Sequence, residues 1–567
     1  MSEQRVCEIT KEPFEVTSEE IKAYQSFDLP LPTLGPNERF RRALSFLSGG
    51  YFFWRKCALT KERVFSAYSK ALPFPVVANE AWDRVDVEAY ARDYDQSETF
   101  FRQLYDLWRS VPRPALNTHK VKRSLVVHES SEIDRSFVLM HSHDVLDSLY
   151  CLGVRQSERC CDCLNVYDCA DCYECINCHS CTNVRWGESS QNCDECSFIF
   201  NCKDCTNCLF CYNLEGKSYH VFNKPVSEEE YRQRVQELNL TARVGVEASK
   251  EKFYDFIKQA NVPHIYAEPE EGVFGNYLYD CESAIHCFEC SDSKNLISCN
   301  GLYNAENCLD GNGFGDNLKD SAQFVSVGHN AKNIINSVEC RDNVSNLEYC
   351  FNCENSSNLF GCVGLSGAEY CVLNKQYIKK QYESLVSLIK SKMDEEGKKG
   401  AYLPSNFSQY AYNHSAANLY MPLNHVQASM FQFIWDEDSE HIRPSQLAGE
   451  DIEKGAARYS ENLDRLEEVA GTNIEDKVFL CEITGKPFQI NKRERELYVR
   501  FRVAPPARSF EQRHRERLMR LSSKKLHAIT SAKSGEALLS AFPNSWKHPV
   551  VSRSEWKKEV AKNSSGG

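Results

Sequence analysis

CADCYECINCHSC (Cys169–Cys181) and NCDECSFIFNCKDCTNCLFCYNL (Asn192–Leu214) belong to one array in which every third residue is small or apolar. Read in steps of three from Ile133 to Leu214, the array has 28 positions, which hold 14 Cys, 8 aliphatic residues, 5 Ser and 1 Gly. The whole chain is 26% charged, so a set of positions without a single charge must face an interior.

A strict period of three excludes the common secondary structures. It drifts by about 60° per step around an α-helix, a 3₁₀-helix rarely exceeds a few residues, and a flat strand has a period of two. We therefore predict a β-solenoid, in which the chain turns a corner every few residues and points one small side chain inward per side. Asn or Asp often precedes the inward residue, as at Asn201, Asp204 and Asn207, and these residues suit tight bends.

The array is duplicated at an offset of 151 residues, because Cys211–Lys224 matches Cys362–Lys375. The second array runs from about Cys281 to Leu365, with fewer Cys and more Ala and Leu. Its phase slips around residues 315–322 and again near 341–344. Short repeats of this kind stack to bury a common core.

A second duplication joins the two ends of the chain. VCEITKEPF at Val6–Phe14 reappears as LCEITGKPF at Leu480–Phe488, and Val76, Val77 and Trp82 match Val550, Val551 and Trp556. Between these anchors, Lys56–Thr60 pairs with Leu526–Thr530, which aligns Cys57 with His527. One fold is therefore used twice.

These features together resemble a family of uncharacterised cysteine-rich proteins abundant in candidate-phyla bacteria with reduced genomes. The matching stretches are CEITGKPF at Cys481–Phe488, QRHRERLMRL at Gln512–Leu521, YHVFNKP at Tyr219–Pro225 and YNHSAANLYMPL at Tyr412–Leu423. The resemblance implies treble-clef zinc-ribbon-like ends and no established activity. It also implies ribbons closed by two Cys-x-x-Cys pairs, from which this chain departs, so Cys7, Cys57, Cys481 and His527 are degenerate ribbon positions.

We predict an α+β chain with a central duplicated β-solenoid, helical inserts and two ribbon-like modules. The expected segments are a ribbon-like module at 1–85, a helical connector at 86–128, solenoid repeat one at 129–260, solenoid repeat two at 261–440, an acidic helical linker at 441–474 and a basic ribbon-like module at 475–567.

The 28 cysteines have two interpretations. Without an export signal we expect a cytoplasmic protein, whose reducing surroundings disfavour disulfides. Replacement by Ala and Leu in the second array favours packing. The alternative is a thiol-rich protein that binds zinc or Cu(I), or buffers redox, since a ladder of thiols could supply ligands. The densest run holds the metal candidates Cys169, Cys172, Cys175, Cys178 and Cys181.

Charge suggests a partner for the C-terminal module. The chain has a formal net charge of −13, yet Cys481–Gly567 has 19 basic and 8 acidic residues. We find no signature of an enzyme, a small-molecule substrate or a membrane span. The leading hypothesis is a non-enzymatic scaffold that binds proteins and, through its basic module, RNA or a ribosome. The candidate phosphate contacts are Arg513, Arg515, Arg517, Arg520, Lys524 and Lys525.

Three of these arginines lie on one face of the expected helix. Arg513, Arg517 and Arg520 follow i, i+4, i+7 spacing. On the hypothesis that this face meets RNA, we expect their reversal to Glu to abolish RNA binding without unfolding the module.

Overall fold

The computed structural model describes residues 2–116, 118–119, 125–128, 130–131, 137–140, 173–174, 176, 186–269, 271–315, 318–319, 321–328, 331–438, 474, 477–490 and 492–565. The chain forms two compact units. Unit 1 consists of Met1–Leu116 and Ile265–His441, and unit 2 of Asn117–His264 and Ile442–Gly567. Each unit thus combines one end of the chain with one half of its middle. Among the described helices, none is both long and apolar enough to cross a membrane.

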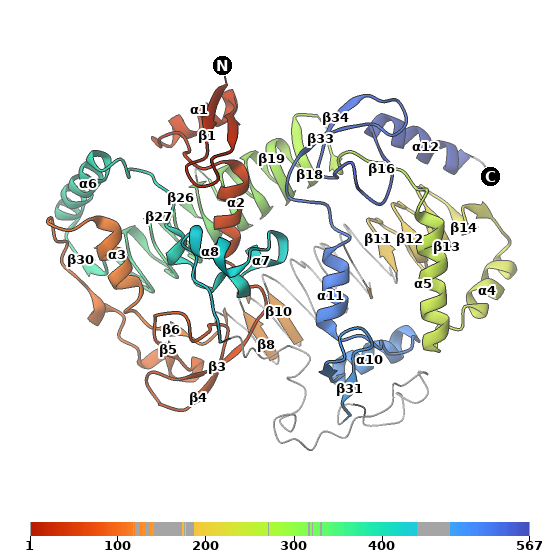
Figure 1. Ribbon diagram of the computed structural model, residues 1–567, viewed down its shortest axis with the longest axis horizontal. Coiled ribbons are helices and arrows are strands. Elements are labelled where there is room, and N and C mark those ends of the chain that lie inside the picture. Colours follow the sequence, from red (N-terminus) through yellow and green to blue (C-terminus); the bar gives the residue numbers. More distant parts are fainter. Residues whose placement is uncertain are drawn as a thin grey trace. The chain divides into compact units, whose positions relative to one another are not determined.

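Unit 1 is a mixed helix and strand structure around a large open sheet (Figure 1). Its N-terminal segment contains β1 (Glu3–Val6), β2 (Pro13–Val16), α1 (Ser18–Ser26), α2 (Pro36–Ser45), β3 (Phe53–Lys56), β4 (Arg63–Ser66), β5 (Val76–Val77), η1 (Asn79–Arg84), η2 (Glu88–Tyr90), α3 (Phe100–Trp108) and β6 (Arg113–Pro114).

The sheet of unit 1 has 14 strands among the described residues. They are β17 (Ala267–Glu268), β18 (Val273–Tyr279), β19 (Glu282–Ser291), β20 (Lys294–Ile297), β21 (Asn300–Tyr303), β22 (Glu306–Leu309), β23 (Asn312–Gly315), β24 (Ser321–Ala322), β25 (Val325–Gly328), β26 (Lys332–Ile335), β27 (Ser345–Glu348), β28 (Ser357–Phe360), β29 (Glu369–Val372) and β30 (Lys375–Gln376). The helices that follow are α6 (Lys379–Glu395), η3 (Ser405–Phe407), η4 (Tyr412–His414), α7 (Ala416–Tyr420) and α8 (His425–Met430).

Unit 2 repeats the plan with a smaller described sheet. Its first segment contains β7 (Thr118–His119), β8 (Leu125–His128), β9 (Ser130–Ser131), β10 (Phe137–Met140), β11 (Gly187–Glu188), β12 (Ser197–Phe200), β13 (Thr206–Tyr212), β14 (Ser218–Val221), β15 (Lys224–Pro225), α4 (Glu228–Glu237), α5 (Arg243–Ile257) and β16 (Val262–Pro263). Its second contains β31 (Phe479–Leu480), β32 (Pro487–Phe488), α10 (Lys492–Phe501), α11 (Phe510–Leu518), β33 (His527–Thr530), β34 (Ala537–Ser540), β35 (Val550–Val551) and α12 (Arg553–Ser565).

Strands of both central sheets pair in parallel with partners about one short repeat away. In unit 2, Ile199 pairs with Cys211, and Leu209 with Val221, which is a repeat of 12 residues. Each repeat contributes four consecutive inward residues, for example Cys193, Cys196, Ile199 and Cys202, none more than 1% exposed. The period of three that the sequence predicts is thus present in the described part of both arrays.

The corners of the repeat have left-handed backbone. The residue before each inward residue has a positive φ, as at Asn201 (53°), Asp204 (52°) and Asn207 (54°). Asn and Asp enter this region at low cost because their short side chains bond locally. The cost is larger at Phe198 and Phe210, whose rings stack on each other with centroids 5.2 Å apart. Stacking between successive repeats therefore holds corners that their own residues disfavour.

The repeat lengthens to 13 residues three times in unit 1. The register shows it at Cys308–Ser321, Ala322–Ile335 and Lys332–Ser345. The buried column accordingly jumps by four residues from Val327 to Ala331 and from Cys340 to Val344. The sequence predicts the slips near 315–322 and 341–344 and misses the one between them.

Inward thiols bond the backbone around them. Cys208 donates to the carbonyl of Thr206 two residues earlier, at 3.6 Å, and lies 3.5 Å from that of Lys217 in the next repeat. Its amide in turn donates to the sulfur of Cys196, 12 residues earlier, at 3.3 Å. Each inward slot therefore suits a small side chain that both donates and accepts.

Serine does the same in this slot. Ser190 donates to the carbonyl of Glu188 at 3.1 Å and accepts the amide of Cys202 at 3.2 Å. Burial raises the pKa of Cys202, Cys287 and Cys350, and neighbouring thiols raise it further. These thiols keep their protons and act as neutral donors.

Two adjacent residues provide a matched test of the inward phase. Cys193 is fully buried and Asp194 is exposed. We expect Cys193→Asp to lower the free energy of unfolding by about 3 kcal/mol, because it buries an unpaired carboxyl group. Cys193→Ser should cost only about 1 kcal/mol, since a hydroxyl can make the same bonds. Urea unfolding checks this, with Asp194→Lys as the control; equal damage at the two positions would contradict the inward phase.

Candidate functional site

The two units share a buried triad that anchors each end segment. In unit 1, Arg39 on α2 donates to Glu20 at 3.0 Å and to Tyr24 at 3.1 Å, both on α1. In unit 2, Arg513 on α11 donates to Glu494 at 2.8 Å and to Tyr498 at 3.2 Å, both on α10. Every member of the second triad lies 474 residues after its counterpart. The duplicated ends therefore keep the same internal ion pair.

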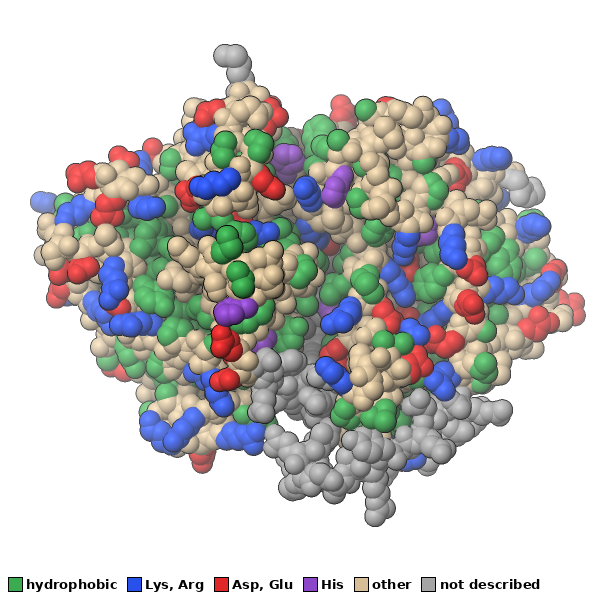
Figure 2. Space-filling view, viewed as in Figure 1, with side chains coloured by type: hydrophobic (Ala, Val, Ile, Leu, Met, Phe, Trp, Pro, Cys, Tyr) green, Lys and Arg blue, Asp and Glu red, His purple; other side chains and the backbone are tan. Residues whose placement is uncertain are grey.

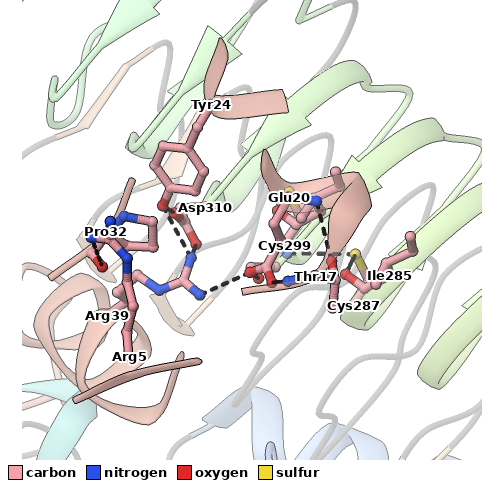
Figure 3. A network of polar contacts seen from close by, with 12 residues as sticks. Arg5, Thr17, Glu20, Tyr24, Pro32, Arg39, Ile285, Cys287, Cys299 and Asp310 are labelled. Carbon is pink, nitrogen blue, oxygen red and sulfur yellow. Dashed lines mark hydrogen bonds and ion pairs between the residues drawn. The ribbon is translucent and has the colours of Figure 1, made fainter. Parts of the chain in front are cut away.

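In unit 1 the triad continues into the sheet and fills its surroundings. Arg39 lies between Asp310 and Glu20 in Figure 3, 2.5 Å from the carboxylate of Asp310. The hydroxyls of Tyr24 and Tyr402 both donate to the other oxygen of Asp310 at 2.5 Å. Burial raises the pKa of both tyrosines, so they remain neutral donors. This network binds α1 and α2 to the turn after β22.

In unit 2 the corresponding helix borders a cavity of about 540 Å³ between α5 and α11. We call this cavity the α5–α11 slot. Its wall is mostly charged and includes Glu174, Val244, Glu247, Ala248, Lys250, Glu251, Tyr254, Pro506, Ala507, Arg508, Arg513, Glu516, Arg517 and Arg520. A volume of this size is typical of pockets that hold small molecules.

The wall of the slot differs from unit 1 at three arginines. By the same offset of 474 residues, Arg508, Arg517 and Arg520 replace Leu34, Ala43 and Phe46, and the last of these is only 3% exposed. Apolar packing positions of one copy have thus become charged positions lining a cavity in the other. Packing alone does not require this change, because unit 1 closes the same frame with apolar residues.

One end of the slot is centred on Arg508. Its guanidinium lies 2.7 Å from Glu482, 3.1 Å from Glu516 and 3.6 Å from Glu247. Arg243 lies 3.4 Å from Glu482 as well. Three carboxylates thus face two guanidinium groups, which leaves one negative charge in excess.

The other end is rich in cations. Arg520 lies 3.0 Å from Glu188 and 4.7 Å from the centre of the Tyr254 ring, and Lys250 lies 2.7 Å from Glu174. Burial acts to raise the pKa of Glu174, but Lys250, Arg517 and Arg520 outweigh it and lower that pKa. Three cations against Glu174 and Glu188 leave one positive charge in excess. Figure 2 shows basic and acidic side chains interleaved on the face over α5 and α11.

The candidate phosphate contacts divide into two groups. Arg513 and Arg517 are buried, at 7% and 3% exposure, and Arg520 is held in the slot. Arg515 and Lys525 are exposed and Lys524 is half-buried. The expectation that the face of Arg513, Arg517 and Arg520 can be reversed without unfolding is therefore wrong for Arg513, because it is the buried partner of Glu494.

The metal candidates Cys169, Cys172, Cys175, Cys178 and Cys181 lie outside the described residues. Among the residues that the structure does describe, no three His, Cys, Asp or Glu side chains converge so that they could hold a metal ion.

The ribbon positions occupy four similar tight turns. In each turn an amide donates to a carbonyl five residues later, and its own carbonyl accepts from the residue four later, which has a positive φ. The residues that begin the turns are Cys7, Cys57, Cys481 and Ser531.

The fourth turn corrects the alignment made from the sequence. β3 and β33 are related by the constant offset of 474 residues, so Ser531 takes the place of Cys57. His527 instead lies at the start of β33, 3.0 Å from the hydroxyl of Ser523.

Hydrogen bonds close these turns in the described structure. The sulfur of Cys57 accepts the amides of Thr60 and Ala78, each at 3.3 Å. Burial acts to raise its pKa, but these donors outweigh it and lower the pKa to about 7. In the fourth turn, Ser531 donates to the carboxylate of Glu555 at 2.6 Å, and the amide of Ser552 donates to it at 2.9 Å. Glu555 was not singled out from the sequence.

Comparison with known proteins assigns no relative to this arrangement. The sequence matches no protein-family model, and no curated protein is significantly similar to it. The chemistry of the slot therefore rests on its own residues.

The buried triad of unit 2 predicts different tolerance at two neighbouring arginines. Arg513→Glu would place a second carboxylate beside Glu494, so we expect it to lower the free energy of unfolding by about 3–5 kcal/mol. Arg515→Glu changes an exposed residue of the same helix and should cost less than about 0.5 kcal/mol. Thermal unfolding of the two full-length variants measures this. Equal stability would show that the triad does not anchor α11.

The Glu555 carboxylate predicts a loss of stability in acid. Hydrogen bonds, the largest from Ser531, lower its pKa from 4.5 to about 2. A lowered folded-state pKa stabilises the folded chain above pH 4.5, and this contribution is lost as the pH falls toward 2. Glu555→Gln cannot titrate, so its stability should fall less steeply over this range than that of the unmodified protein. Urea midpoints between pH 7 and pH 3 test the slope; parallel curves would refute the assignment.

Proposed function

We propose that this protein is a non-enzymatic binding scaffold, in which a duplicated β-solenoid supports two zinc-ribbon-like ends and the α5–α11 slot of unit 2 is the binding site. The observation that carries the proposal is the divergence of one frame used twice. The Glu–Tyr–Arg triad is kept in both ends, whereas Leu34, Ala43 and Phe46 are replaced by three arginines around a cavity. Retention of the frame with a changed wall fits a binding role for one copy.

The architectural part of the proposal rests on pairing and packing. Parallel strands separated by 12 or 13 residues, left-handed corners and a continuous buried column are what a β-solenoid requires. The four tight turns, each followed by a helix, agree with ribbon-like ends. The bonds of Cys57 and of Glu555 would close such ribbons without a metal ion.

RNA or ribosome association through the basic C-terminal module stays a prediction with a smaller surface behind it. Only Arg515, Lys524 and Lys525 of the six candidate residues lie outside the slot and the triad. We therefore expect weaker and more salt-sensitive RNA binding than a row of exposed arginines would give. Partner proteins along the solenoid remain part of the proposal.

The alternative function, thiol-based metal binding or redox buffering, would have to use Cys169, Cys172, Cys175, Cys178 and Cys181. The described inward thiols disfavour it for their own positions, since a raised pKa opposes the thiolate that a metal needs. Metal analysis before and after replacing those five cysteines with Ala separates the two functions.

Filling the slot tests the proposed function. Ala248 is an exposed residue of α5 that lines the slot, so Ala248→Trp would occupy the cavity without removing an ion pair. Thermal shifts of the full-length protein are measured with inorganic phosphate, an RNA hairpin, free arginine and trialanine. Gln236→Trp on the exposed face of α4 is the control.

At least one of these probes should raise the melting temperature of the unmodified and control proteins but not that of Ala248→Trp. If no probe stabilises the protein in a way that Ala248→Trp abolishes, the slot is not a binding site.

A further inference from the structure

The slot is dipolar, and this property restricts what it can bind. Around Arg508 the carboxylates of Glu247, Glu482 and Glu516 outnumber their guanidinium partners. Around Arg520, cations outnumber carboxylates. A ligand with a single anionic group would be attracted at one end and repelled at the other.

The two ends are separated along α5. Glu247 belongs to the acidic end and Tyr254, which carries Arg520 on its ring, to the cationic end. The seven residues between them span roughly 10 Å of helix, at 1.5 Å per residue. Charged groups of a complementary ligand should therefore lie about 10 Å apart.

We infer that the α5–α11 slot binds a short zwitterionic peptide, with its ammonium group at Glu247 and Glu516 and its carboxylate at Lys250 and Arg520. This inference rests on the proposed function, because it names the ligand class of the same site. An extended tripeptide separates its terminal charges by roughly 10 Å, at about 3.3 Å per residue. Its size also suits a cavity of about 540 Å³.

The lining supports a peptide over a compact anion. Ala248, Pro506 and Ala507 provide small apolar surfaces between the charged ends, against which peptide side chains can pack. A free phosphate would use only the cationic end, where Glu174 and Glu188 already neutralise most of the charge. The acidic end would then have no role in binding.

Isothermal titration of the full-length protein tests the inference. Trialanine with free termini is compared with N-acetyl-trialanine amide, which has the same shape and no charges. We expect the free peptide to bind at least about tenfold more tightly, which corresponds to 1.4 kcal/mol. Ala248→Trp should abolish this binding.

A second variant removes one charge at the acidic end. Glu247 is 46% exposed, so Glu247→Gln leaves the core intact and should weaken binding of the free peptide by about fivefold to tenfold. It should leave the blocked peptide unaffected, which separates loss of a contact from loss of the fold.

Three outcomes would overturn the inference. Equal affinity for free and blocked peptide would exclude charge recognition at the two ends. Binding of phosphate or RNA in the slot without binding of the peptide would replace the ligand class and leave the proposed function standing. Absence of slot-dependent binding by any probe would refute both.

Discussion

The constraint on which this structure depends is the three-residue side with a left-handed corner. Such a side leaves room inside for one small group, and that group must bond the carbonyls and amides that the corners turn inward. A neutral thiol or hydroxyl satisfies both demands, as Cys208 and Ser190 show with nearly the same partners. Cysteine adds apolar surface that serine lacks. The abundance of Cys therefore follows from packing at these positions, and the thiols that fill them must stay protonated.

A stack built in this way gives each end segment a regular side to pack on. In unit 1 the turn at Asp310 receives Arg39 and two tyrosines, and the contact is filled. In unit 2 the matching arginine keeps its own triad, and the helix beyond it lines a cavity with a different wall. Duplication thus supplied two copies of a stable frame, one of which could exchange apolar contacts for charged ones without losing its anchor. The proposed function and the ligand class both derive from that exchange.

The sequence predicted the inward phase because an uncharged period of three has few structural explanations. It could not give the repeat of 12, since any multiple of three preserves the phase and only strand pairing selects one. It missed the slip between Val327 and Ala331 because apolar residues such as Val325 occupy both candidate phases there. It grouped Arg513, Arg517 and Arg520 on one face, but spacing cannot tell which way a face points. The Glu-x-x-x-Tyr pairs before both arginines, at Glu20 and Glu494, were the missed signal.

The central claim is that the described thiols are buried, protonated packing groups. Alkylation of the native protein under reducing conditions, followed by mass spectrometry of each cysteine peptide, tests it most directly. The account predicts that Cys193, Cys208, Cys287 and Cys350 stay unmodified until the chain unfolds and react fully in denaturant. Rapid modification of these cysteines in the native protein, at the rate of an exposed thiol, would contradict it.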